Sequence, residues 1–246
     1  MPALCRPCRT ARYGPPVTDH ALARGEKPVH YSGIMSIFKT NDTVLFQGDS
    51  ITDAGRRDDP LGLGSGYAAM AAGLATAARP DLGLRFINRG VGGDRTVELL
   101  ARWKPDCEVI RPDILSIKIG VNDVWRYLGE WEGQTFVDAA EYRTNLVRLL
   151  DRALAAGVRT LVLCSPTTIE NNRNPLISEM LAERRDIVRA LAAEYRAVYV
   201  PMQETQLALL AERSDIAWTL DGCHLSTAGH AVLAKLWVDT VLSDCP

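Results

Sequence analysis

The sequence predicts one α/β domain built on a mostly parallel sheet. From Thr43 onward, short apolar and β-branched runs alternate with longer segments of helical period, which is typical of repeated βα units. The chain has 246 residues, which suits a single domain of this class, and no internal repeat or linker follows residue 35. We therefore expect one domain over residues 35–246.

Residues 1–34 differ in composition from the rest of the chain. They combine cysteine, arginine and proline without a periodic apolar pattern, and they lack the continuous apolar stretch of a secretory signal. We expect this segment to be a disordered leader or to lie upstream of the functional start, for which Met35 is a candidate.

Five buried strands are predicted, each a short apolar run bounded by turn residues. The first run is Val44–Phe46, which stops at Gly48-Asp49-Ser50. The predicted strands are Thr43–Gln47, Leu84–Asn88, Asp113–Ile119, Arg159–Cys164 and Val198–Pro201.

Five helices are predicted between and after these strands. An alanine-rich helix, Tyr67–Ala78, is stopped by Pro80, and Asp94 is expected to cap Thr96–Lys104 until Pro105 ends it. Three further segments carry leucine at helical spacing. They are Phe136–Ala155, which stops at Gly157, then Leu176–Tyr195, and a last helix that begins after Ser226 as its N-cap.

The composition excludes several classes of function. The chain is 47% hydrophobic and 24% charged with a net charge of −2, so nothing indicates binding to nucleic acid. No apolar stretch reaches the roughly 18 residues of a membrane span. The six cysteines are scattered, which favours a reducing compartment, and we expect a cytoplasmic protein. Cys5-x-x-Cys8 lacks a second ligand pair, so no metal site is predicted.

Ser50 is the candidate nucleophile, delivered at the carboxyl end of the first strand. Serine needs a base, and only His224 and His230 of the four histidines fall inside the predicted fold. Asp221 precedes His224 by three residues on one loop and can orient its ring, which is the logic of a catalytic triad. His230, inside the last helix, is expected to be structural.

Donors for a developing oxyanion are expected at two other strand ends. The glycines of Gly90-Val91-Gly92-Gly93 allow close approach of the backbone, so the Gly93 N–H is one candidate. Asn122 follows the third strand as a second donor, and the N–H of Ser50 is a third. Each run could also be an ordinary turn when taken alone.

Four blocks resemble those of the SGNH (GDSL-type) hydrolase superfamily, in the same chain order. They are Gly48-Asp49-Ser50-Ile51-Thr52-Asp53, Gly90-Val91-Gly92-Gly93-Asp94, Gly120-Val121-Asn122-Asp123 and Asp221-x-x-His224. The resemblance implies a three-layer α/β/α sandwich with a flavodoxin-like five-stranded parallel sheet, order 2-1-3-4-5, and ester hydrolysis without a cofactor. The Gly-x-Ser-x-Gly elbow of the α/β-hydrolases is absent around Ser50.

A narrower resemblance concerns the substrate. Gly62–Tyr67, Asp53–Arg56 and Asn122–Arg126 are similar to bacterial intracellular acetylxylan esterases of this superfamily. That resemblance implies an acetylated carbohydrate substrate and a homo-oligomer. Aromatic and arginine side chains suit a sugar site, although tryptophans can equally fill a core or a subunit interface. The candidates for substrate binding are Trp125, Arg126, Tyr127 and Trp131.

Two alternatives remain open at this point. One is a lysophospholipase, thioesterase or arylesterase of the same superfamily, which would prefer longer acyl chains or other leaving groups. The other is a non-catalytic carbohydrate-binding or scaffold protein that retains the hydrolase fold.

Overall fold

The computed structural model describes residues 37–125, 136–170 and 174–242. Five parallel strands form one sheet in this part of the chain, in the order β2-β1-β3-β4-β5. The predicted α/β sandwich and its strand order are therefore confirmed, and every strand agrees with its prediction to within one residue at either end. The strands are β1 (Thr43–Gly48), β2 (Arg85–Asn88), β3 (Ile114–Lys118), β4 (Thr160–Cys164) and β5 (Val198–Val200).

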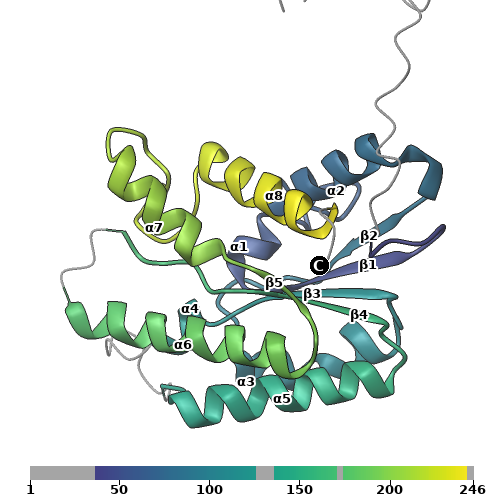
Figure 1. Cartoon of the computed structure of the whole chain (residues 1–246), viewed down its shortest axis with the longest axis horizontal. Coiled ribbons are helices and arrows are strands. Elements are labelled where there is room, and N and C mark those ends of the chain that lie inside the picture. Colours follow the sequence, from purple (N-terminus) through teal and green to yellow (C-terminus); the bar gives the residue numbers. More distant parts are fainter. Residues whose placement is uncertain (1–36, 126–135, 171–173, 243–246) are drawn as a thin grey trace, which may run out of the picture. The chain divides into compact units, whose positions relative to one another are not determined.

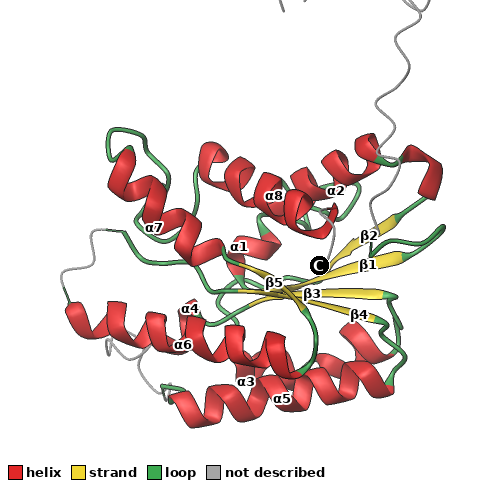
Figure 2. Ribbon diagram, in the orientation of Figure 1, coloured by secondary structure: helices red, strands yellow, loops and turns green. Residues whose placement is uncertain are grey.

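Helices cover both faces of this sheet (Figures 1 and 2). One face packs on α2 (Tyr67–Ala78) and α8 (Thr227–Leu242). The other face packs on α3 (Thr96–Ala101), α5 (Ala139–Ala155) and α6 (Pro175–Glu194). Side chains of a strand alternate between its faces, so successive residues of β1 enter different cores.

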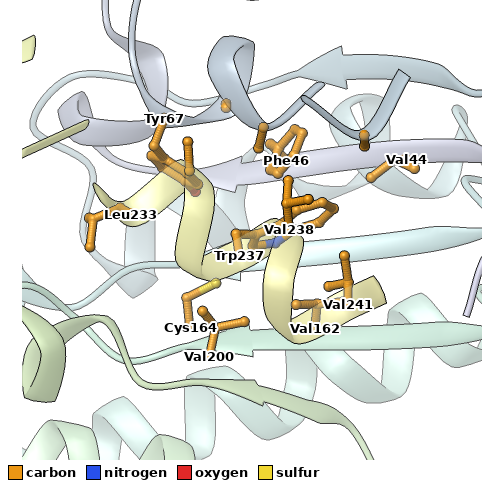
Figure 3. Close-up of a cluster of buried hydrophobic side chains, with 14 of the residues drawn as sticks. Val44, Phe46, Tyr67, Val162, Cys164, Val200, Leu233, Trp237, Val238 and Val241 are labelled. Carbon is orange, nitrogen blue, oxygen red and sulfur yellow. The ribbon is translucent and has the colours of Figure 1, made fainter. Parts of the chain in front are cut away.

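Aromatic side chains fix α8 on the sheet. Figure 3 shows Phe46 of β1 beside Trp237 of α8 and Tyr67 of α2. The ring centroid of Phe46 lies 5.0 Å from that of Trp237 and 5.9 Å from that of Tyr67. The buried indole N–H of Trp237 donates to the Ser116 hydroxyl at 3.0 Å, so its burial leaves no unpaired donor. This packing holds α8 against the sheet, and the loop that carries His224 leads into this helix.

The predicted start of the helix at Thr96 is confirmed, but its predicted cap and its predicted end are wrong. Arg95, not Asp94, is the N-cap of α3, and its side chain and backbone pair with Glu98 in a capping box. The carboxylate of Asp94 instead accepts a hydrogen bond from Arg102. Pro105 does not end the helical path, because it lies in the first turn of a π-helical segment, η2 (Lys104–Glu108), where a missing N–H costs nothing.

Several elements were absent from the prediction. Two are single turns at strand ends, α1 (Ser50–Asp53) and α4 (Val121–Trp125), which are too short for a periodic pattern, as is the 3₁₀ turn η1 (Pro80–Leu82). The third helix is α7 (Met202–Glu212), whose buried residues include Gln203 and Gln206, so its inner face does not read as apolar. The predicted helix 136–155 begins at Ala139, because the Asp138 side chain caps it.

The sheet order places the functional blocks in one crevice. Strand β2 lies on one side of β1 and β3 lies on the other, so the order of the strands reverses direction at β1. Ligands of such folds bind in the crevice at this point, beyond the carboxyl ends of the strands. Gly48 at the end of β1 pairs in register with Lys118 at the end of β3. Ser50 and Asn122 therefore leave the sheet from adjacent strands, as predicted.

Two predictions cannot be compared with the described structure. Residues 1–34 lie outside the described ranges, and one domain over residues 35–246 stays a prediction. Among the described residues, no helix combines the length and the apolar character needed to cross a membrane.

Candidate active site

The nucleophile turn begins where β1 ends. Asp49 caps the single turn α1, with its Oδ1 accepting the Ile51 N–H at 3.0 Å, and Ser50 is the first residue of that turn. Only glycine fits at position 48, because a Cβ there would lie 2.3 Å from the Lys118 carbonyl oxygen. Tight packing thus fixes the angle at which Ser50 leaves the strand.

Ser50, His224 and Asp221 form one continuous chain of hydrogen bonds. The Oγ of Ser50 lies 2.9 Å from Nε2 of His224, and Nδ1 of His224 lies 2.6 Å from Oδ2 of Asp221. A carboxylate can only accept, so it selects the tautomer with hydrogen on Nδ1 and leaves Nε2 to accept from the serine. The structure thus brings together the three residues that the sequence singled out as a triad.

The loop before α8 holds the Asp221 carboxylate in place. Its Oδ1 accepts the backbone N–H groups of Cys223 and His224 at 2.9 and 2.7 Å. Burial alone would raise the pKa of Asp221, but the hydrogen bonds from His224 and Cys223 outweigh it and lower the pKa to about 2. The carboxylate is therefore charged throughout the neutral pH range and can stabilise an imidazolium. Gly222 turns the loop at φ +91°, against the Glu170 backbone.

His230 has a structural partner. Its Nδ1 accepts the Tyr67 N–H at 3.1 Å, at the start of α2. Burial, together with the positive charge of Lys118, lowers the pKa of His230 to about 4. A neutral ring engaged with the backbone agrees with the structural role expected from the sequence.

The candidate oxyanion donors lie on the neighbouring loops. Asn122 lies in α4, and its Nδ2 donates one hydrogen to the Asp94 carbonyl at 3.0 Å, which leaves the second amide hydrogen for a ligand. A Cβ at Gly92 would lie 3.9 Å from Cβ of Ser50, so this loop passes beside the nucleophile. Gly93 adopts φ +81°, in the left-handed region that favours glycine. Its role as a donor stays a prediction.

Gly90 serves protein packing and not the approach of a ligand. A Cβ at this position would lie 2.3 Å from the Asp53 nitrogen, in the turn that carries Ser50. The Asp53 carboxylate also accepts the Gly92 N–H at 3.2 Å, and the Arg56 side chain donates to the Gly90 carbonyl at 2.6 Å. The loop after β2 is thereby attached to the nucleophile turn.

A buried ion pair beneath the nucleophile was missed by the sequence reasoning. The Nζ of Lys118 lies 3.2 Å from Oδ2 and 3.3 Å from Oδ1 of Asp49, and both side chains are 0% exposed. A lysine within the otherwise apolar run Ile117–Ile119 is a signal that could have pointed to it, since buried lysine requires a partner.

One of the four predicted substrate residues lies beside the base. Trp125 is half-buried against the cluster that contains Val124 and Cys223, and its ring centroid lies 6.4 Å from that of His224. The other three, Arg126, Tyr127 and Trp131, lie outside the described residues. The described residues contain no group of three or more histidine, cysteine or acidic side chains placed to hold a metal ion.

Comparison with known proteins agrees with this geometry. Residues 46–232 match the GDSL-like lipase/acylhydrolase family. An acetylxylan esterase of Geobacillus stearothermophilus is 35% identical over 205 residues, which cover 81% of this chain and 93% of that protein.

Solved structures give the same result. The crystal structure of that organism's acetylxylan esterase Axe2 matches with a TM-score of 0.76 at 33% identity, covering 84% of this chain and 96% of that one. LAE5, an alpha/beta hydrolase enzyme from the metagenome of Lake Arreo, Spain, matches with a TM-score of 0.76 at 30% identity, over 84% of this chain and 97% of that one.

Proposed function

Because the chain belongs to the GDSL-like lipase/acylhydrolase family and is a carboxylic ester hydrolase, we propose that it deacetylates O-acetylated xylo-oligosaccharides or related sugars through an acyl-enzyme on Ser50. The observation that carries this proposal is the chain of hydrogen bonds from Ser50 through His224 to Asp221, with lengths of 2.9 and 2.6 Å. The similarity to an acetylxylan esterase supports the choice of substrate class.

In the proposed acylation step, the Oγ of Ser50 attacks the acetyl carbonyl carbon while Nε2 of His224 takes the hydroxyl proton. Asp221 stabilises the resulting imidazolium. The carbonyl oxygen becomes an oxyanion held by the N–H groups of Ser50 and Gly93 and by the Asn122 amide. The intermediate then collapses, the bond to the sugar oxygen breaks, and that oxygen takes the proton from His224.

In the proposed deacylation step, water replaces the sugar. His224 removes a proton from the water, whose oxygen attacks the acetyl carbon of the acyl-enzyme, and the same donors hold the second oxyanion. Collapse releases acetate and returns the proton to Ser50. Every group in these steps comes from the chain or from water, so the proposed reaction uses no cofactor.

Substrate binding is proposed for Trp125, Arg126, Tyr127 and Trp131. The face of Trp125, 6.4 Å from the His224 ring between centroids, offers an apolar surface on which a pyranose ring can pack. Arginine and tyrosine would donate hydrogen bonds to sugar hydroxyls.

We also propose that the protein acts as a homo-oligomer in the cytoplasm. Three buried cysteines of the described chain, Cys107, Cys164 and Cys223, are free thiols, which supports a reducing compartment. Light scattering on the purified protein tests the oligomer, since a particle mass equal to one chain would contradict it.

Acetate release from a panel of acetylated xylo-oligosaccharides, other acetylated sugars and a lysophospholipid tests the proposed substrate. We expect the acetylated xylo-oligosaccharides to be hydrolysed fastest, and p-nitrophenyl esters to be hydrolysed more slowly as the acyl chain lengthens from acetyl to octanoyl. A rate that rises along the ester series would instead assign the chain to the lysophospholipase and thioesterase group.

The Ser50→Ala variant tests the mechanism itself. Loss of a triad nucleophile costs several orders of magnitude in kcat, so hydrolysis of p-nitrophenyl acetate should fall to background. Activity within a few-fold of the wild type would refute the role of Ser50. Binding of acetylated sugars by the wild-type protein without release of acetate would contradict the proposed deacetylation.

A further inference from the structure

Arg102, at the end of α3, joins the loops behind the candidate oxyanion hole. Its guanidinium donates through Nη2 to the Gly48 carbonyl at 3.2 Å and through Nη1 to the Arg89 carbonyl at 2.7 Å. Gly48 precedes Ser50 by two residues, and Arg89 opens the loop that leads to Gly93. One rigid, planar group therefore sets the spacing between the strand that delivers the nucleophile and the loop that carries a predicted oxyanion donor.

The same guanidinium reaches the third predicted donor through one intermediate residue. Its Nε donates to the Asp94 carboxylate at 2.5 Å. The carbonyl of Asp94 accepts the Asn122 amide at 3.0 Å, and Asp94 directly follows Gly93 in the chain. The position of Asp94 thus bears on Gly93 through the backbone and on Asn122 through a hydrogen bond.

The guanidinium itself is anchored from behind. Its Nη1 also donates to the Asp106 carboxylate at 2.9 Å and to the Gln47 side-chain oxygen at 3.0 Å, and the Arg102 side chain is only 17% exposed. Lysine is a single ammonium point on a flexible stem and cannot satisfy this spread of acceptors at once, whereas the arginine fork can.

We propose that Arg102 is a positioning residue of the oxyanion hole, which sets the relative placement of the Ser50, Gly93 and Asn122 donors without touching the substrate. This inference rests on the proposed function, because it concerns the hole that the proposed reaction uses. Displacement of reacting groups by about 1 Å can cost roughly 100-fold in rate, so small shifts of these loops should be measurable.

The test is the Arg102→Lys variant in the full-length protein, assayed on p-nitrophenyl acetate. We expect kcat to fall by about 10- to 100-fold with KM within about two-fold, since the interactions lost are those of the transition state. Circular dichroism melts establish that the variant is folded at the assay temperature. A folded variant with unchanged kcat would overturn the proposal and leave Arg102 a purely structural residue.

Arg152→Lys is the matched control. This arginine of α5 also makes an ion pair, with Glu108 at 2.6 Å, and also donates to a backbone carbonyl, that of Leu100 at 3.4 Å. Neither of these contacts involves Gly48, Arg89 or Asp94. We expect its kcat to stay within about two-fold of wild type. An equal loss of kcat in both variants would show a general effect of arginine removal and would overturn the proposal.

A double variant separates positioning of the hole from other losses. In the Asn122→Ala background one positioned donor is already gone, so Arg102→Lys should lower kcat by a smaller factor than it does in the wild type. An equal factor in both backgrounds would overturn the proposal.

If Arg102→Lys does not fold, Asp106→Asn loosens the anchor instead, and we expect kcat to fall at least three-fold. An unchanged kcat in that folded variant would count against the inference.

Failure of this inference is distinguishable from failure of the proposed function. Loss of hydrolysis in Ser50→Ala tests the proposed function alone, whereas the Arg102 variants are compared with an active wild type.

Discussion

Removal of the Lys118 charge should destabilise the protein strongly. Lys118 and Asp49 are both 0% exposed, and Nζ lies 3.2 Å from the nearer carboxylate oxygen. In Lys118→Met the stem of the side chain is replaced at similar volume, but the Asp49 carboxylate stays buried, with the Ile51 N–H as its partner at 3.0 Å. Breaking a buried ion pair in this way typically costs about 3–5 kcal/mol.

The double variant Asp49→Asn/Lys118→Met separates the lost charge from lost packing. It removes both charges, and an asparagine oxygen can still accept the Ile51 N–H. Replacing a whole buried pair by neutral groups is often close to neutral, so we expect the double variant to recover most of the free energy of unfolding lost in Lys118→Met.

Urea unfolding at neutral pH measures both changes. Lys235→Met is the matched control, since Lys235 pairs with Asp239 at 2.5 Å with side chains 71% and 56% exposed, and its loss should cost less than about 1 kcal/mol. A loss below about 1 kcal/mol in Lys118→Met, or a double variant no more stable than the single one, would refute the reasoning.

Three further predictions concern the site. Burial lowers the pKa of His230 to about 4 from 6.5, so the unfolded state binds more protons and stability falls from pH 6.5 to 4. In the His230→Asn variant, the midpoint of urea unfolding should therefore depend less on pH between 6.5 and 4 than it does in the wild type. An equal slope in the two proteins would contradict this prediction. Burial also raises the pKa of Asp123 to about 6, which changes stability with pH in the opposite direction. This contribution is the same in the wild type and the variant, so it cancels in the comparison. Gly90→Ala should lower kcat at least 10-fold, because its Cβ would lie 2.3 Å from a backbone nitrogen of α1. Gly73→Ala, with nothing within 4 Å, should leave kcat unchanged. Trp125→Ala should raise KM for acetylated xylo-oligosaccharides about 10-fold and change p-nitrophenyl acetate hydrolysis only a few-fold, whereas equal effects on both would exclude a sugar-binding role.

The fold was predictable where the apolar pattern of a segment matches its burial in the folded protein. The runs that became β1 and β3 are buried along their whole length, so apolar composition marked them to within one residue. The pattern failed for α7, because its inner face includes the polar residues Gln203 and Gln206. The side-chain oxygen of Gln206 accepts the Thr168 N–H at 3.0 Å. It also failed at Asp94, because the side chain that competes for its carboxylate, Arg102, lies eight residues further along the chain.

The candidate site divides in the same way. Ser50, Asp221 and His224 could be placed from sequence, because Ser50 follows the first strand, Asp221 and His224 share the loop before the last helix, and the residue types fit one chemistry. The partners of Lys118 and Arg102 were not predicted, because residue types alone do not show which side chains meet once the strands and loops pack together. Lys118 meets a carboxylate 69 residues away, across the β1–β3 pair. Such groups support the site without carrying a motif of their own.

Covalent trapping of the acyl group tests the central claim most directly. The enzyme is mixed rapidly with p-nitrophenyl acetate, quenched in acid, digested and analysed by mass spectrometry. The proposed mechanism predicts one acetyl group on the peptide that contains Ser50, at Ser50 itself, with none in the Ser50→Ala variant. Continued hydrolysis with no acetyl group on Ser50, or with the acetyl group on another side chain, would contradict it.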